Sequence, residues 1–178
     1  MSTPTPPIQP CCADLAMSPQ RLLFVCLGNI CRSPAAEGVF LHLLAREGLN
    51  DKFVVDSAGT GSWHVGKPAD RRMLAAAERR GIALPSRARQ IEAADLGRFD
   101  RILTMDNDNL AAVEAMARSS PASAARDLAL IEPITRHCRQ FGLEEVPDPY
   151  YGGEDGFEQV LDLLEDACGG LLDDLRTP

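Results

Sequence analysis

An apolar run from Leu22 to Val25 leads directly into Cys26, and Pro34 follows eight positions after that cysteine. The run predicts a buried strand, and proline is favoured in the first turn of a helix, so residues 26–33 are expected to form the loop between them. Backbone N–H groups in such a loop point inward, and the start of the helix adds partial positive charge. The segment therefore predicts an anion-binding loop.

Cys26 and Arg32 give this loop its predicted chemistry. The loop amides, the helix end and the guanidinium all favour thiolate over thiol at Cys26, and the thiolate is the nucleophilic form. A loop that binds a tetrahedral anion beside such a sulfur suits attack on a phosphate ester, with a cysteinyl-phosphate intermediate and Arg32 holding two phosphate oxygens. The alternative is that Cys26 is a buried structural cysteine and Arg32 forms a surface ion pair.

Strand and helix patterns alternate along the chain. This alternation predicts an α/β fold in which a parallel sheet is covered by helices on both faces, with the reactive loops at the carboxyl ends of the strands. The last helix pattern, Phe157 to Leu175, is the clearest, although Gly169 and Gly170 are expected to weaken it by about 2 kcal/mol relative to alanines. The other expected strands are 53–55, 101–105 and 128–131, and the other expected helices are 34–48, 68–81 and 110–117.

The composition indicates one globular domain. The formal net charge of −8 over 178 residues disfavours nucleic acid and anionic membranes as partners, because those surfaces repel an acidic chain. Residues 1–20 are proline-rich and poor in apolar residues, so we expect a flexible N-terminal tail, with the pair Cys11 and Cys12 incidental rather than acylated or metal-binding, and a folded domain over 21–178. The six cysteines fit a reducing compartment, and no secretory signal is recognisable, so we expect a cytoplasmic protein.

Two motifs more than a hundred positions apart carry a family resemblance. The segment from Cys26 to Pro34 resembles the signature of the low-molecular-weight protein tyrosine phosphatases, and Asp148-Pro149-Tyr150-Tyr151 resembles the general-acid motif of that family. The similarity extends to 56–59, 88–90 and 99–106, and so spans most of the chain from Arg21 onward. The resemblance implies a three-layer sandwich with a four-stranded parallel sheet in the order 2-1-3-4, no cofactor, phosphotyrosyl protein substrates, and a monomer or weak dimer.

Asp148 is the expected proton donor to the leaving phenolate. In the second half-reaction the same carboxylate is expected to take a proton from the attacking water. An isolated Asp-Pro pair more often starts a turn, and the resemblance is what favours the catalytic interpretation here. Tyr150 and Tyr151, the only tyrosines, are expected to line one side of a deep slot, with Trp63 on the other side or, alternatively, as an ordinary loop aromatic.

The other residues of the loop are expected to bind the substrate and to shape the loop. Asn29 tolerates a positive φ, and the hydroxyl of Ser33 is expected to cap the helix and stabilise the leaving thiolate, with help from Ser57. Relatives often have a histidine where this chain has Ser86, and that histidine braces the loop asparagine. We therefore expect a water or another side chain to take over this support. The other substrate-binding residues expected in the loop are Leu27, Gly28, Ile30 and Cys31.

Several further interpretations stay open at this point. Cys31 is expected to trap an oxidised Cys26 as a disulfide, or alternatively to be structural. A metal site is disfavoured because no further cysteines or histidines have zinc spacing. Asp106 is expected to support a loop rather than act as an acid, and the three histidines, His42, His64 and His137, are expected to be surface or packing residues.

Three other functions compete with tyrosine phosphatase activity. A thiol-coupled arsenate reductase needs relay cysteines, and positions 82–100 contain none. A phosphoarginine phosphatase is disfavoured by the bulky Ile30, because relatives with that preference have a smaller polar residue there. A non-catalytic phosphate-binding module has no use for Asp148.

Overall fold

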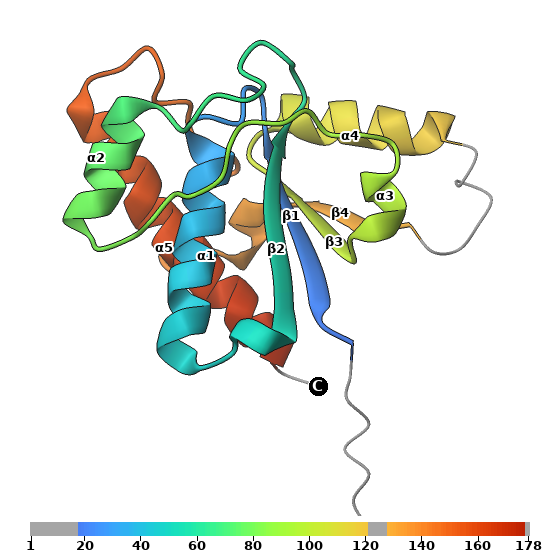
Figure 1. Cartoon of the computed structure of the whole chain (residues 1–178), viewed down its shortest axis with the longest axis horizontal. Helices are drawn as coiled ribbons and strands as arrows, with labels where there is room; N and C mark the ends of the chain where they lie inside the picture. The colour runs from blue at the N-terminus through green and yellow to red at the C-terminus, as the bar shows by residue number, and fades with distance from the viewer. Residues whose placement is uncertain (1–17, 121–127, 177–178) are drawn as a thin grey trace, which may run out of the picture.

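The computed structural model describes residues 18–120 and 128–176, and these form an α/β sandwich (Figure 1). Four parallel strands make one sheet in the order β2-β1-β3-β4, which confirms the predicted topology. The predicted tail lies almost wholly outside the described residues, as do Cys11 and Cys12. The strands are β1 (Gln20–Cys26), β2 (Phe53–Gly59), β3 (Arg101–Thr104) and β4 (Leu130–Pro133).

Helices cover both faces of the sheet, as predicted. Figure 1 shows α1, α2 and α5 on one side of the sheet and α3 and α4 on the other. The residues of β1 explain the two layers, because Leu22 and Phe24 pack into the core under the first group while Leu23 and Val25 pack into the core under the second. The helices are α1 (Arg32–Glu47), α2 (Arg71–Arg79), α3 (Asp95–Arg98), α4 (Asn107–Ser119) and α5 (Glu154–Arg176).

Helix caps explain where the observed boundaries differ from the expected ones. The side chain of Asp106 accepts a hydrogen bond from the Asn109 amide, so α4 begins three residues before the predicted start. Asp70 caps α2 in the same way through the Arg72 amide, so the helix predicted from Pro68 begins only at Arg71. The predicted strand 53–55 extends to Gly59, and the short helix α3 was not predicted.

A close backbone contact explains one of the two glycines of α5, Gly170. A Cβ atom added to Gly170 would lie 1.9 Å from the carbonyl oxygen of His137, in the short 3₁₀ helix η3 (Ile134–His137). Glycine therefore allows η3 to pack directly on the α5 backbone, and this packing offsets the low helix propensity of the residue.

None of the helices in the described residues is both long enough and apolar enough to cross a membrane.

The residues predicted to be catalytic lie at one edge of the sheet. The loop after β1 and the loop after β2 both leave the sheet at the carboxyl ends of their strands, and their backbones are joined where the Thr60 amide donates to the Cys26 carbonyl over 2.9 Å.

Candidate active site

The loop between β1 and α1 holds Cys26 at its base. The thiol of Cys26 is buried at the end of β1, and it lies 3.0 Å from the Ser33 hydroxyl and 3.3 Å from the Asn29 amide nitrogen. Asn29 has a φ of 55°, the left-handed conformation predicted for it. Helix α1 begins at Arg32, two residues before the predicted start, and has no acidic residue in its first turn. Its positive N-terminal end therefore adds to the loop amides, as an anion site requires.

Arg32 is held by two carboxylates from distant parts of the chain. Its Nη1 atom lies 2.6 Å from Oδ2 of Asp106, and its Nη2 atom lies 3.1 Å from Oδ2 of Asp148. Nη1 also donates to the Val146 carbonyl oxygen. Burial opposes the positive charge, but the negative charge of a Cys26 thiolate and of the two carboxylates outweighs it and raises the pKa of Arg32 above its ordinary value. The guanidinium is therefore a fixed cation beside the loop.

Asp148 reaches the same place from the segment before α5. Besides its contact with Arg32, its Oδ1 atom accepts a hydrogen bond of 3.1 Å from the Tyr150 amide. The side chain is 40% exposed, unlike the Arg32 side chain at 4%. Its carboxyl group is thus oriented by two contacts and remains accessible from the cavity. Asp106, in contrast, supports Arg32 and caps α4, which matches its expected structural role.

A chain of side-chain hydrogen bonds braces the loop from behind. The amide group of Asn29 donates to Ser33 over 2.8 Å and to Ser57 over 2.9 Å, and its Oδ1 accepts from the Arg89 amide. Because the Ser33 oxygen accepts from Asn29, its own hydroxyl hydrogen can be donated either to the Cys26 sulfur at 3.0 Å or to the Ala58 carbonyl oxygen at 3.3 Å. The expected supporting role of Ser57 is consistent with these contacts.

The brace ends on a buried carboxyl group that the sequence analysis missed. The hydroxyl of Ser57 donates to Oε2 of Glu37 over 2.6 Å, and Glu37 also has a side-chain hydrogen bond with Ser86. Ser86 therefore acts on Glu37, and Asn29 is supported by Ser57 and the Arg89 backbone instead. One signal for Glu37 was present in the sequence, since it follows Ser33 by four positions on α1 and so shares its buried face.

Glu37 gives the protein a testable pH dependence of stability. Burial raises the pKa of Glu37, although the hydrogen bonds from Ser57 and Ser86 oppose this effect. The folded protein thus favours the protonated acid, and the resulting stabilisation is present below the unfolded pKa of about 4.3 and is lost as the pH rises through the folded pKa. Glutamine imitates the protonated acid, so we expect Glu37→Gln to gain stability relative to the parent between pH 4 and pH 8.

Thermal unfolding of both proteins over this pH range measures the effect. Glu78→Gln, which changes an exposed carboxyl of α2, is the control and should not change the pH dependence. Parallel curves for Glu37→Gln and the parent protein would contradict the predicted ionisation of Glu37 at the higher pH values.

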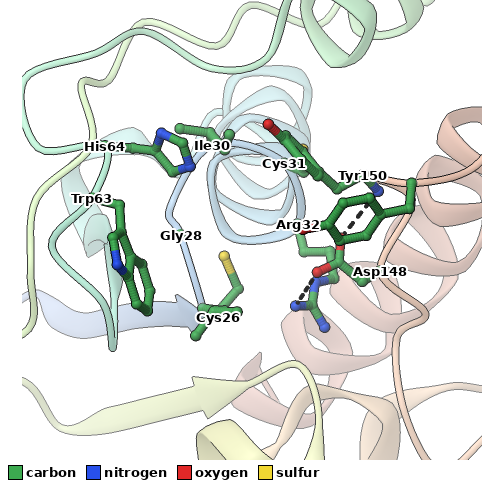
Figure 2. A pocket seen from close by; sticks show the side chains of 11 residues that line it. Cys26, Gly28, Ile30, Cys31, Arg32, Trp63, His64, Asp148 and Tyr150 are labelled. Atoms are coloured by element: carbon green, nitrogen blue, oxygen red, sulfur yellow. Dashed lines mark hydrogen bonds and ion pairs between the residues drawn. The ribbon is translucent and has the colours of Figure 1, made fainter.

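A cavity of about 310 Å³ opens above Cys26 (Figure 2). Figure 2 shows Trp63 and His64 on one side of the Cys26 thiol and Asp148 and Tyr150 on the other. The cavity brings together the residues predicted to be catalytic and most of those predicted to bind substrate. Its lining residues are Cys26, Leu27, Gly28, Ile30, Cys31, Arg32, Trp63, His64, Asp148, Tyr150 and Tyr151.

The predicted residues that do not line the cavity are Asn29, Ser33, Ser57 and Ser86, whose contacts lie behind the loop. The two tyrosines differ, because Tyr150 is partly buried whereas Tyr151 is 93% exposed and lies edge-on to Tyr150. His64, expected to be a surface or packing residue, is partly buried and also lines the cavity, a position that was not predicted. Its neighbour Trp63 gave the stronger signal in the sequence as the only tryptophan.

The two loop cysteines have different environments. Burial and the nearby carboxylate of Asp70 raise the pKa of Cys31 to about 12, so Cys31 is a thiol near neutrality. The sulfur of Cys26 lies within hydrogen-bond distance of the Ser33 hydroxyl and the Asn29 backbone amide. Of the two, Cys26 therefore has the environment of a nucleophile.

Comparisons with known proteins agree with this geometry. Residues 21–178 match the model of the family described as low molecular weight phosphotyrosine protein phosphatase. The low molecular weight protein-tyrosine-phosphatase YfkJ of Bacillus subtilis is 40% identical over 152 residues, which are 85% of this chain and 92% of YfkJ.

Two solved structures are similar over nearly their whole length. The crystal structure of a protein tyrosine phosphatase from Entamoeba histolytica has a TM-score of 0.80 and 44% identity, with 88% of this chain and 96% of that chain covered. The crystal structure of DARP, a Drosophila arginine phosphatase, has a TM-score of 0.79 and 34% identity, with 88% and 98% covered. With the family model matched from Arg21 to the last residue, this chain belongs to the low molecular weight phosphotyrosine protein phosphatase family.

Proposed function

We propose that the chain hydrolyses phosphotyrosine in proteins, and small aryl phosphates, through a cysteinyl-phosphate intermediate. The observation that carries the proposal is that Cys26, Arg32 and Asp148 line one cavity, with Asp148 hydrogen-bonded to Arg32. A nucleophile, a cation for the phosphate oxygens and a proton donor are the three groups that this reaction needs.

In the first step, the Cys26 thiolate attacks phosphorus, the S–P bond forms and the bond to the phenolic oxygen breaks. Asp148 gives its proton to that oxygen, which leaves as the phenol. The loop amides and Arg32 stabilise the charge on the three remaining oxygens. Ser33, 3.0 Å from the sulfur, stabilises the thiolate by donating a hydrogen bond.

In the second step, water attacks the phosphorus of the intermediate. Asp148, now a carboxylate, takes a proton from the water while the S–P bond breaks and Cys26 leaves as the thiolate. Inorganic phosphate is the product. In the free protein Asp148 contacts Nη2 of Arg32, so we infer that the arriving phosphate takes over this nitrogen and releases the carboxyl group toward the leaving oxygen.

The competing functions have less support. A thiol relay for arsenate reduction would have to use Cys138 or Cys168, but neither lines the cavity, and burial raises the pKa of both thiols. Phosphoarginine is the alternative substrate, because one structural relative is an arginine phosphatase. Ile30 lines the cavity and favours an aromatic ring over a guanidinium at that position.

The redox role of Cys31 and the cytoplasmic location remain predictions. The four cysteines among the described residues, Cys26, Cys31, Cys138 and Cys168, are free thiols, which supports a reducing compartment.

Steady-state hydrolysis tests the proposed function. We expect p-nitrophenyl phosphate and a phosphotyrosyl peptide to be hydrolysed in the presence of a metal chelator, and vanadate to inhibit competitively. Phosphoarginine hydrolysis and thiol-coupled arsenate reduction, measured with the same preparation, should be much slower. A requirement for an added divalent cation, or a preference for phosphoarginine, would argue against the proposal.

A further inference from the structure

The segment that follows β2 is the basic part of an acidic chain. Residues 60–90 contain seven arginines and lysines and two acidic residues, a net charge of +5, whereas the whole chain has a net charge of −8. Figure 1 shows that the connection from β2 to α2, which begins this segment, runs over the end of the sheet at which β1 and β2 finish. The positive charge of the chain is therefore concentrated in the segment that includes Trp63 and His64 of the cavity.

Three of these seven cations have no carboxylate partner. The four that pair with carboxylates within the fold are Arg72, Arg79, Arg80 and Arg89. The other three, Lys67, Arg71 and Arg87, are exposed and form no ion pair with any residue that the structure describes. The Arg87 side chain donates to the Gly66 carbonyl oxygen over 3.1 Å, a contact that leaves its charge uncompensated. We call Lys67, Arg71 and Arg87 the basic patch.

Backbone contacts place two residues of the basic patch next to each other and beside the cavity. Lys67 closes a tight turn in which its amide donates to the His64 carbonyl oxygen over 2.9 Å. Arg87 forms an isolated antiparallel bridge with Pro68, the residue after Lys67. Because His64 lines the cavity, both cations lie near its edge.

Arg71 approaches the same edge from the start of α2. It follows Asp70, whose amide donates to the Ile30 carbonyl oxygen over 2.7 Å. Figure 2 shows Ile30 beside His64 and across the opening from Asp148. The basic patch therefore lies along one side of the opening, outside the cavity itself.

The opposite side of the opening has the opposite charge. Residues 144–155, which include Asp148 and Tyr150 of the cavity, contain five carboxylates and no lysine or arginine, a net charge of −5. The side chains of Glu144, Glu145 and Asp148 are exposed. A peptide bound across the opening thus meets positive charge on one side and negative charge on the other.

We propose that the basic patch binds aspartate and glutamate residues that flank the phosphotyrosine of protein substrates. This inference rests on the proposed phosphatase function and adds the class of phosphoprotein, namely one with an acidic sequence beside the phosphorylated tyrosine. With the phosphotyrosine in the cavity, its neighbours in the peptide remain outside. An extended chain advances about 3.3 Å per residue, so two or three flanking residues reach over the basic patch. Complementary charge of this kind favours encounter and binding rather than the chemical step.

Steady-state hydrolysis of three phosphotyrosyl peptides of equal length tests the basic patch. The residues around the phosphotyrosine are Asp and Glu in the first peptide, Asn and Gln in the second, and Lys in the third. We expect the parent kcat/KM to be about tenfold higher for the acidic peptide than for the neutral one, because three exposed ion pairs each change binding by about twofold. The lysine peptide should be the poorest substrate. The differences should lie in KM, with kcat nearly constant.

The triple variant Lys67→Gln/Arg71→Gln/Arg87→Gln should prefer the acidic peptide by about twofold or less. Its hydrolysis of p-nitrophenyl phosphate, which has no flanking residues, should stay close to the parent rate. The matched control is Arg46→Gln/Lys52→Gln, which removes two exposed cations without ion pairs near the C-terminal end of α1, away from the cavity. The control should keep the full preference. An ionic strength of about 0.5 M should remove most of the parent's preference, since the Debye length is then about 4 Å.

Two outcomes would overturn the inference. Equal kcat/KM for the acidic and the neutral peptide in the parent would show that flanking carboxylates are not recognised. A preference that persists in the triple variant would assign the recognition to other residues. In both cases hydrolysis of p-nitrophenyl phosphate leaves the proposed function standing. A parent protein that hydrolyses neither p-nitrophenyl phosphate nor any peptide would refute the proposed function, and calorimetric binding of the same three peptides would then test the basic patch by itself.

Discussion

Replacing Cys26 by serine should lower the turnover of p-nitrophenyl phosphate by about 10⁵-fold while phosphate still binds. The hydroxyl of serine is almost never ionised near neutral pH, so the nucleophile is lost. The loop amides, the N-terminus of α1 and Arg32 all remain, and the side chain is nearly the same size. Since the thiolate no longer repels a dianion, inorganic phosphate is expected to bind as tightly as in the parent or more tightly.

Steady-state rates and calorimetric phosphate binding, measured on the same preparations, check this prediction. Cys138→Ser is the matched control, because Cys138 does not line the cavity and the same atom is exchanged. Rapid quenching of the parent enzyme with substrate should also yield a phosphorylated peptide that contains Cys26. Comparable turnover in Cys26→Ser and Cys138→Ser would remove Cys26 from the mechanism.

The segment from Leu22 to Pro34 could be interpreted from the sequence because its structure is set locally. The apolar run is buried on both faces of the sheet, the left-handed residue is an asparagine, and the helix follows within a few positions. The alternation of such units was enough to predict a parallel sheet with two helical layers. The strand order was implied by the family resemblance and is confirmed.

Contacts between distant segments could not be predicted in the same way. Arg32 meets Asp106 and Asp148 across 74 and 116 positions, and no local pattern encodes those pairings. Glu37 was overlooked because a lone glutamate in an apolar helix is usually solvated, whereas here two serines bind its carboxyl group in the core. The position of His64 in the cavity wall was not predicted, because a loop histidine carries no signal until the fold places it on Gly28.

The contacts of Arg32 with its two carboxylate partners determine how the proposed acid, Asp148, can be tested. Arg32 has two carboxylate partners, and Asp148 is the exposed one while Asp106 is the more buried one. Removing either carboxylate alters the environment of Arg32, but only Asp148 lines the cavity. The substitution Asp106→Asn removes the charge beside Arg32 but keeps an oxygen that can cap α4, so it is the control for the effect on Arg32.

Replacing Asp148 by alanine should slow phenyl phosphate by about 10³-fold and p-nitrophenyl phosphate much less. Phenolate is a poor leaving group without a proton, whereas p-nitrophenolate is stable as the anion and needs little help. A series of substituted phenyl phosphates should thus show a steeper dependence of kcat on leaving-group basicity in Asp148→Ala than in the parent. Asp106→Asn should lower all rates by a similar factor, since Arg32 acts on the phosphate whatever the leaving group. If Asp148→Ala also lowers every rate equally, Asp148 serves only to orient Arg32, and another group must protonate the leaving oxygen.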